Sequence, residues 1–129
     1  MTIQKEMFGS LELDKKIVTA LTDMGFEEPS PIQAATIPLV LEGNDVIGQA
    51  QTGTGKTAAY GLPVLQKVDA TRNVTQALIL SPTRELCLQI ADDLENYSKY
   101  LPGVRVLPVY GGANIEPQIR TLRKGVQVI

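Results

Sequence analysis

Residues 50–57 read "AQTGTGKT", and this segment is the most informative one in the sequence about the fold. It follows a short apolar run that begins at Asp45, and it precedes residues that can start a helix. Gly53 and Gly55 have no Cβ, so the backbone there can adopt left-handed angles and approach a ligand closely. Such a turn directs successive N–H groups into one concavity that suits phosphate oxygens. A strand, a Gly-rich turn and a helix in this order therefore predict a phosphate-binding loop.

The last two residues of this stretch carry the chemistry expected of a nucleotide site. Lys56 would place its charge at the β- and γ-phosphates, and Thr57 would offer its hydroxyl to Mg²⁺. A helix that begins here would add N–H groups and a dipole that favour an anion. Ala50 stands where the general pattern has Gly, which is a departure. A second interpretation therefore stays open at this point, in which the stretch is only a surface turn.

Composition narrows the class of protein. The 129 residues are 43% hydrophobic and 20% charged, which is enough for one core and one domain. The net charge of −2 and the pI of about 5.1 mean that any contact with nucleic acid has to be local. The chain has no His, which excludes imidazole catalysis and His-ligated metals.

Three further signals indicate the compartment. Cys87 is the only cysteine, so no internal disulfide can form, and its helix-like setting favours a small core residue. No apolar run approaches the roughly 18 residues of a membrane span. Residues 1–6 lack the apolar core of a signal peptide. We expect a soluble, cytoplasmic protein that makes no contact with membranes.

Helix and strand signals alternate along the chain. Caps, prolines and apolar spacing predict helices over Lys15–Met24, from Ser30-Pro31 to a bend or end near Pro38, over 57–69 with a kink at Pro63, over Arg84–Tyr100, and over Ile115–Lys124. Leu86, Leu88, Ile90 and Leu94 would face inward in the fourth of these. Apolar runs predict strands over Asp45–Ala50, Ala77–Leu80, Val104–Tyr110 and from Val126 onward.

This alternation predicts an α/β fold, with a parallel sheet and helices on both of its faces. Ligands of such sheets bind at the carboxyl ends of the strands. Three features occupy those ends: the loop Gly53–Thr57, the stretch Ser81–Glu85, and Gly111-Gly112. We expect the functional residues to gather there.

Four stretches together resemble the DEAD-box RNA helicases, and bacterial members in particular. They are GFEEPSPIQ (25–33, the Q motif), AQTGTGKT (50–57, motif I), PTRELCLQ (82–89, motif Ia) and GG (111–112, the GG motif). Ala at the first position of motif I is normal in that family, so Ala50 is no longer an anomaly. The resemblance covers nearly the whole chain from Phe8 onward, and the Q motif is peculiar to this family among helicases.

The resemblance implies ATP and Mg²⁺ as cofactors. Gln33 would read the adenine edge, because its amide offers both a donor and an acceptor. Phe8, at the position of the family's upstream aromatic residue, would stack on the base, with a core anchor as the alternative. Phe26 would pack the turn of the Q motif. The implied nucleotide-binding residues are Phe8, Phe26, Gln33, Ala50, Gln51, Thr52, Gly53, Thr54, Gly55, Lys56 and Thr57. Lys56 and Thr57 would be catalytic, and Thr57 would hold the metal.

The resemblance also implies RNA as a partner, bound through its backbone without regard to base sequence. Arg84 and its neighbours would hold RNA phosphates at the start of a helix. The glycines would let the RNA backbone approach closely. The implied RNA-binding residues are Pro82, Thr83, Arg84, Glu85, Gly111 and Gly112. The alternatives are a solvated charge at Arg84 and a simple turn at the glycines.

Later motifs of the family are missing, and the most important of them is the acidic one. The Asp-Glu-Ala-Asp sequence, which would hold Mg²⁺ and position water, does not occur, and neither does the second RecA-like domain. The adjacent acidic residues are Glu27-Glu28 and Asp92-Asp93, and we interpret the second pair as a solvated helix face. We expect residues 1–129 to be the N-terminal part of RecA-like domain 1, a truncated three-layer P-loop NTPase domain. The parent protein would couple ATP binding and hydrolysis to RNA unwinding, and the chain alone would not unwind.

Two other functions were weighed. A small-molecule kinase or a GTPase would share the phosphate loop, but the Q-motif setting of Gln33 argues against both, and the Asn-Lys-x-Asp guanine signature is absent. A non-catalytic nucleotide or RNA sensor would account for the missing acidic motif.

Overall fold

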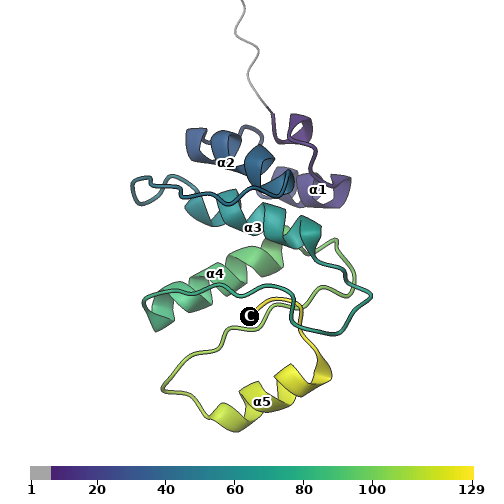
Figure 1. Cartoon of the computed structure of the whole chain (residues 1–129), viewed down its shortest axis with the longest axis vertical. Helices are drawn as coiled ribbons and strands as arrows, with labels where there is room; N and C mark the ends of the chain where they lie inside the picture. Colours follow the sequence, from purple (N-terminus) through teal and green to yellow (C-terminus); the bar gives the residue numbers. More distant parts are fainter. Residues whose placement is uncertain (1–6) are drawn as a thin grey trace, which may run out of the picture. The chain divides into compact units, whose positions relative to one another are not determined.

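The computed structural model describes residues 7–129, and helices are the regular elements within that range (Figure 1). The chain divides into two compact units, of which the first ends at Lys67 and the second begins at Val68. The elements in chain order are η1 (Phe8–Ser10), α1 (Lys15–Asp23), α2 (Pro31–Leu41), α3 (Lys56–Lys67), α4 (Arg84–Tyr97) and α5 (Ile115–Lys124).

Helix α1 begins and ends where its local signals predict. The Asp14 carboxylate accepts a hydrogen bond from the Lys16 N–H at 2.8 Å, which caps the first turn. The N–H of Gly25, which has φ +83°, donates to the Thr22 carbonyl after the last turn. Ile17 and Leu21 lie one turn apart on the face that enters the core, and both are almost completely buried. The predicted helix 15–24 is confirmed to within one residue.

Helix α2 begins at Pro31 as predicted and runs through Pro38 to Leu41. The predicted end near Pro38 was therefore wrong, and the alternative, a bend at Pro38, stays a prediction. A proline removes its own N–H from the helix, yet its carbonyl still accepts a bond from the residue four positions later. The Glu42 N–H donates to the Pro38 carbonyl at 3.1 Å, so hydrogen bonding resumes directly after the proline.

Helix α3 packs against α2 in the first unit, and Figure 1 shows the two helices side by side. Residues 50–55 belong to the segment that connects them. The helix continues through Pro63, whose side chain is fully buried, so tertiary packing outweighs the missing hydrogen bond. Gln66, near the end of α3, links this helix to the segment that directly precedes α1. Its Oε1 accepts from the Asp14 N–H at 2.7 Å, and its Nε2 donates to the Glu12 carbonyl at 2.8 Å.

In the second unit, α4 is shorter than the predicted 84–100 because Ser98 ends it. The Ser98 hydroxyl donates to the Leu94 carbonyl at 2.8 Å. Ile90 and Leu94 are buried as predicted, whereas the side chains of Leu86 and Leu88 are 36% and 37% exposed. The prediction for those two leucines was wrong, because the buried face of α4 is carried by its C-terminal half, where Ala91 and Tyr97 complete it.

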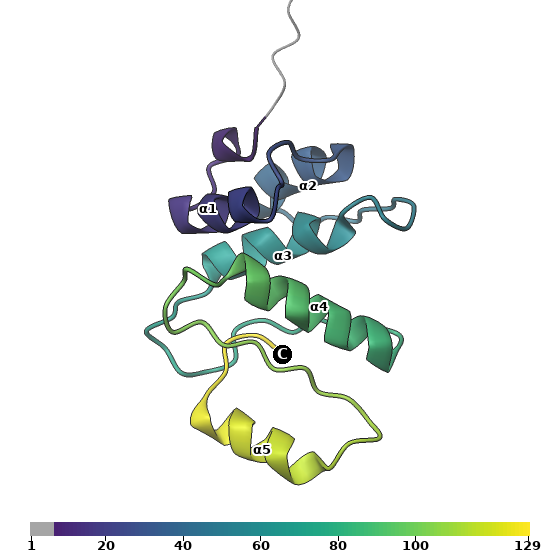
Figure 2. The same ribbon diagram turned by 180° about the vertical axis from the view of Figure 1, so that it is seen from behind.

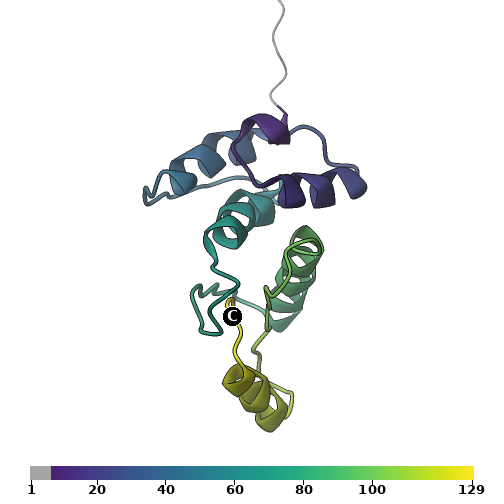
Figure 3. The same ribbon diagram turned by 90° about the vertical axis from the view of Figure 1, so that its right-hand side faces the viewer.

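Three extended segments of the second unit lie side by side. Ala77 and Val106 each form a parallel bridge with Val128, so the segment from Val126 lies between the other two. The Ala77 N–H donates to the Gln127 carbonyl at 3.0 Å, and the Leu107 N–H donates to the Val128 carbonyl at 2.9 Å. Figures 2 and 3 show α4 and α5 on opposite sides of these segments. The parallel direction is as predicted.

The strands themselves are not formed over the predicted ranges. Among residues 7–129 the pairing is limited to those isolated bridges, and the predicted strand Asp45–Ala50 carries no ladder. Ile47, in its middle, is fully exposed. A strand requires a neighbour to satisfy its N–H and C=O groups, and this segment has none in the described chain. The three-layer sheet therefore remains a prediction.

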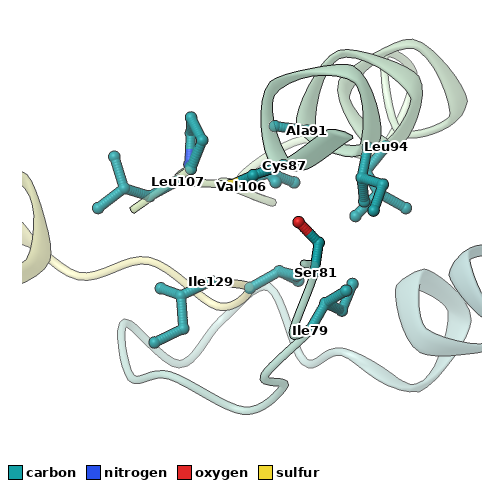
Figure 4. Close-up of a pocket in the computed structure, with 11 residues that line it drawn as sticks. Ile79, Ser81, Cys87, Ala91, Leu94, Val106, Leu107 and Ile129 are labelled. Carbon is teal, nitrogen blue, oxygen red and sulfur yellow. The ribbon is translucent and has the colours of Figure 1, made fainter. Parts of the chain in front are cut away.

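A small apolar cavity of about 30 Å³ lies under α4 in the second unit. Figure 4 shows Cys87, Ala91 and Leu94 on the helix side, and the Ser81 hydroxyl pointing into the space. Cys87 is partly buried, with its Sγ 3.8 Å from the Val109 carbonyl oxygen. Cys87 thus helps to wall the interior, as the sequence predicted. Within residues 7–129, no helix combines the length and the apolar character needed to cross a bilayer.

Candidate functional site

The predicted phosphate loop is a turn with two glycines at positive φ. Gly53 has φ +81° and Gly55 has φ +84°, both in the region that residues with a Cβ rarely adopt. The Thr54 hydroxyl donates to the Gln51 carbonyl at 2.6 Å, which closes the turn. Helix α3 begins directly after it, at Lys56. The first N–H groups of a helix have no intrahelical partner, so those of α3 remain available beside the loop.

Lys56 folds back over the loop in this structure. Its Nζ donates to the Ala50 carbonyl at 2.7 Å, across the base of the turn. The ammonium group is therefore held at the loop itself, where an anionic ligand would compete with the carbonyl for it. Thr57 is the second residue of α3 and is partly buried.

Gln33 joins the Q motif to the phosphate loop. Its side chain is only 8% exposed. Its Oε1 accepts from the Ser30 N–H at 2.9 Å, and this bond closes the N-terminus of α2. Its Nε2 donates to the Gly55 carbonyl at 3.0 Å, twenty-two positions further along the chain. One amide thus fixes the start of one helix and the start of the next.

The contact between Gln33 and the loop requires glycine at position 55. A Cβ built on Gly55 would overlap Gln33 Nε2 and would stand 3.4 Å from the Ser30 hydroxyl oxygen. At Gly53 the corresponding space is open. The Ser30 hydroxyl is itself buried without a hydrogen-bond partner, among the described residues the one such side chain. The backbone of the loop therefore approaches the Q motif more closely than any residue with a Cβ would allow.

The two aromatic residues differ from each other. Phe8 is 3% exposed, and its N–H donates to the Glu27 carbonyl at 3.2 Å, so it anchors the core of the first unit. Its predicted stacking on a base remains a prediction. Phe26 is 49% exposed, and its N–H donates to the Leu21 carbonyl. Its packing against the turn of the Q motif stays a prediction.

A larger cavity of about 470 Å³ in the first unit opens beside Lys56. Ile32, Thr36 and Tyr60 contribute to its walls. Its lining includes Ile32 of the Q motif and Lys56 of the loop, but neither Gln33 nor the loop glycines.

In the second unit, four of the predicted RNA-binding residues, Pro82–Glu85, lie at the start of α4, and these four and the two glycines are all exposed. Thr83 caps the helix, with its hydroxyl accepting from the Leu86 N–H at 3.1 Å. Ser81 supports the same turn by donating to the Thr83 carbonyl at 3.0 Å. The Arg84 guanidinium lies 3.9 Å from the Glu85 carboxylate, a weak and solvated pair.

The structure brings the GG motif next to this helix start. Gly112 has φ +83°, and a Cβ built there would overlap Arg84 Nη1. Gly111 has open space around it. Two stretches that resemble RNA-binding motifs, twenty-eight positions apart, thus meet through Arg84 and Gly112. Sequence reasoning missed Gln118, which bonds the backbone on both sides of the glycines; a Gln one turn after the predicted helix start at Ile115 was the available signal.

The two adjacent aspartates on α4 differ in their exposure to solvent. Asp92 is exposed, whereas Asp93 is partly buried, which corrects the interpretation of both as a solvated face. Burial raises the pKa of the Asp93 carboxyl, and the charge of Asp92 raises that pKa further. Within the described part of the chain, no group of three or more His, Cys, Asp or Glu side chains gathers as a metal-ligand set.

Comparison with known proteins gives one answer. The family model described as "DEAD/DEAH box helicase" matches residues 30–129. "ATP-dependent RNA helicase CshA" of Listeria monocytogenes is 57% identical over 122 residues, which are 95% of this chain and 23% of that protein. "ATP-dependent RNA helicase DeaD" of Buchnera aphidicola is 50% identical over the whole chain, which covers 22% of its length. The chain thus spans less than a quarter of these relatives.

Solved structures agree with the sequence comparison. A DEAD box protein from Methanococcus jannaschii matches with a TM-score of 0.88 and 39% identity, over 95% of this chain and 34% of that one. A hypothetical ATP-dependent RNA helicase from Sulfolobus tokodaii matches with a TM-score of 0.80 and 37% identity, over 90% and 33%. The phosphate loop, the Q motif that touches it and these matches lead to one conclusion: the chain belongs to the DEAD/DEAH box helicase family.

Proposed function

We propose that this chain is the ATP-binding part of an ATP-dependent RNA helicase, formed by the N-terminal part of its first RecA-like domain. The parent protein would couple the binding and hydrolysis of ATP to the local unwinding of RNA in the cytoplasm. The observation that carries this proposal is the amide of Gln33, which holds the Q motif against the phosphate loop at Gly55.

The remaining hydrogen-bonding capacity of Gln33 fits adenine. A Gln amide has two N–H donors and an oxygen with two lone pairs. One donor is used by the Gly55 carbonyl and one lone pair by the Ser30 N–H, which leaves one donor and one acceptor. Adenine offers an amino donor beside a ring acceptor, whereas the matching edge of guanine offers two acceptors. Gln33 would therefore accept adenine and reject guanine without giving up its structural bonds.

The loop supplies the residues for the phosphates and the metal. A bound phosphate chain would draw Lys56 away from the Ala50 carbonyl, to which its Nζ donates at 2.7 Å without a ligand. The free N–H groups at the start of α3 would face the same anion. Thr57 would hold Mg²⁺ together with phosphate oxygens, and the metal would neutralise charge that develops during phosphoryl transfer.

The second unit supplies a surface for RNA. Pro82, Thr83, Arg84 and Glu85 lie exposed at the start of α4, and Gly112, the second glycine of the GG stretch, lies against Arg84 there. The available groups are backbone N–H donors and one guanidinium, which suit phosphate oxygens and carry no base-reading pattern. RNA would thus be bound by its backbone, without regard to sequence.

The test is a calorimetric titration of the 129-residue chain with Mg-ADP, beside two lysine variants. Lys56→Ala should weaken binding by about tenfold or more, because a charge-assisted contact to phosphate contributes about 1.5–3 kcal/mol. Lys67→Ala is the matched control, since Lys67 is exposed at the far end of the same helix. It should bind ADP like the unaltered chain.

Equal losses in both variants would mean that net charge, rather than the loop, attracts the nucleotide. Tight binding by Lys56→Ala would contradict the phosphate role of the loop.

A further inference from the structure

The turn that contains Gly111 and Gly112 is flexible by composition, although the RNA contact proposed above requires a fixed backbone. Two adjacent glycines have more backbone freedom than any other pair of residues. Both are exposed, and Gly111 has no atom near the place where a Cβ would stand. A surface that holds a phosphate has to be fixed before binding, because the cost of ordering it is otherwise subtracted from the affinity. Something outside the glycines has to fix the turn.

Gln118, on α5, makes the bonds that do so. Its Oε1 accepts from the Tyr110 N–H at 3.2 Å, and its Nε2 donates to the Tyr110 carbonyl at 3.3 Å. The same Nε2 lies 3.4 Å from the Asn114 carbonyl oxygen. Tyr110 directly precedes the two glycines, and Asn114 follows them with one residue, Ala113, in between. A single side chain therefore holds both ends of the turn.

The helix that carries Gln118 is anchored at the same place. The Asn114 side chain accepts from the Glu116 N–H at 3.1 Å and so caps α5. The turn, the cap and the first turn of α5 thus form one hydrogen-bonded unit. The position of Gly112 relative to α5 is set by this unit rather than by the glycines.

The fixed turn also sets the place of Arg84. Gly112 lies so close that a Cβ there would overlap Arg84 Nη1, and the distance from that Cβ position to Arg84 Cζ would be 3.6 Å. The guanidinium therefore lies over the bare Cα of Gly112. If the turn moved, the Arg84 guanidinium would lose its contact with Gly112. The salt bridge to Glu85, at 3.9 Å, is too long and too exposed to hold the guanidinium in place alone.

We propose that Gln118 is a positioning residue for RNA: it holds the turn 110–114 so that Gly112 seats Arg84 for a phosphate. The inference rests on the RNA role proposed above. It assigns a function to a side chain outside the four motif-like stretches. Gln118 itself would not touch RNA, and its effect would pass through the turn to Arg84.

Two measurements on Gln118→Ala test this. Hydrogen exchange should show that the Tyr110 amide loses about tenfold or more of its protection, since its acceptor is gone. Titration with single-stranded RNA at several salt concentrations should show weaker binding and a salt slope smaller by about 0.7, the value for one lost phosphate contact. Thr121→Ala is the matched control, because the Thr121 hydroxyl bonds only to Pro117 of its own helix. It should change neither quantity.

A double variant separates positioning from general loss of structure. In the Arg84→Ala background, Gln118→Ala should have little further effect on RNA affinity, since both changes remove the same contact. Additive losses would overturn the inference, and so would unchanged protection of the Tyr110 amide. If the unaltered chain binds no RNA, the proposed RNA surface fails, and the binding role of Gln118 fails with it. The exchange result would still report whether Gln118 holds the turn.

Discussion

At the scale of single residues, the nucleotide site depends on an amide and a glycine that fit each other. Gln33 and Gly55 could both be named from the sequence, because motif spacing placed them in the Q motif and the phosphate loop. Their direct bond could not be predicted, since it joins positions twenty-two residues apart and depends on how α2 packs against α3. The burial of Phe8 and the exposure of Phe26 are also tertiary outcomes that local pattern does not determine.

The two loop glycines offer a matched pair of substitutions. Gly53→Ala should destabilise the chain by about 1–2 kcal/mol, because an alanine is forced to positive φ in otherwise open space. Gly55→Ala carries the same strain, and it also displaces Gln33, which adds about 1–3 kcal/mol for its lost hydrogen bonds. Urea unfolding at 25 °C measures the difference. Equal costs for the two variants would show that the contact between Gln33 and the loop contributes nothing.

At the scale of elements, the helices follow from the sequence and the strands do not. Asp14 and Ser30-Pro31 are local signals, and each stands at the start of a helix. Asp45–Ala50 is as apolar as a strand should be, but strand formation depends on a hydrogen-bonding neighbour. Pro38 shows the opposite error, since α2 continues past a residue that local rules treat as a stop, with hydrogen bonding resumed at the Pro38 carbonyl.

Thr83 should have a stabilising role apart from any role in RNA binding. Thr83→Ala removes the cap on the Leu86 N–H and should cost about 1 kcal/mol of unfolding free energy. Thr83→Ser keeps the hydroxyl and should cost much less. Denaturant midpoints of the two variants check this, and an equal loss in both would mean that the methyl group, rather than the cap, carries the stability.

The partly buried carboxyl of Asp93 should make α4 sensitive to pH. Its pKa in the folded state is raised above 3.8, so the ionised form is the one that folding disfavours. Near pH 7 the penalty is present, and it disappears as the pH falls through the raised pKa toward 3.8. Asp93→Asn should therefore stabilise the chain slightly at pH 7, by less than about 1 kcal/mol after solvent screening.

That gain should vanish below about pH 4 in thermal melts. Asp92→Asn, at the exposed neighbour, is the control and should give a smaller gain. A gain for Asp93→Asn that stays constant from pH 7 to pH 4 would show that burial of the charge is not its cause.

At the scale of the whole molecule, the chain spans 22–23% of the length of the two curated helicases compared above, and its sequence does not contain Asp-Glu-Ala-Asp. Phosphoryl transfer needs an acidic residue for the metal and a group that orients water. We therefore expect no ATP-dependent strand displacement from the 129 residues, even if they bind nucleotide. An RNA duplex assay with and without ATP measures this, and ATP-dependent unwinding would contradict the account.

Gln33 and the phosphate loop should form a site for adenine nucleotides within this chain. Parallel calorimetric titrations with Mg-ADP and Mg-GDP would decide this. We expect that ADP binds and that GDP does not, and that Gln33→Ala loses this discrimination. Equal binding of ADP and GDP by the unaltered chain would contradict the role of Gln33 and return the loop to a general phosphate site.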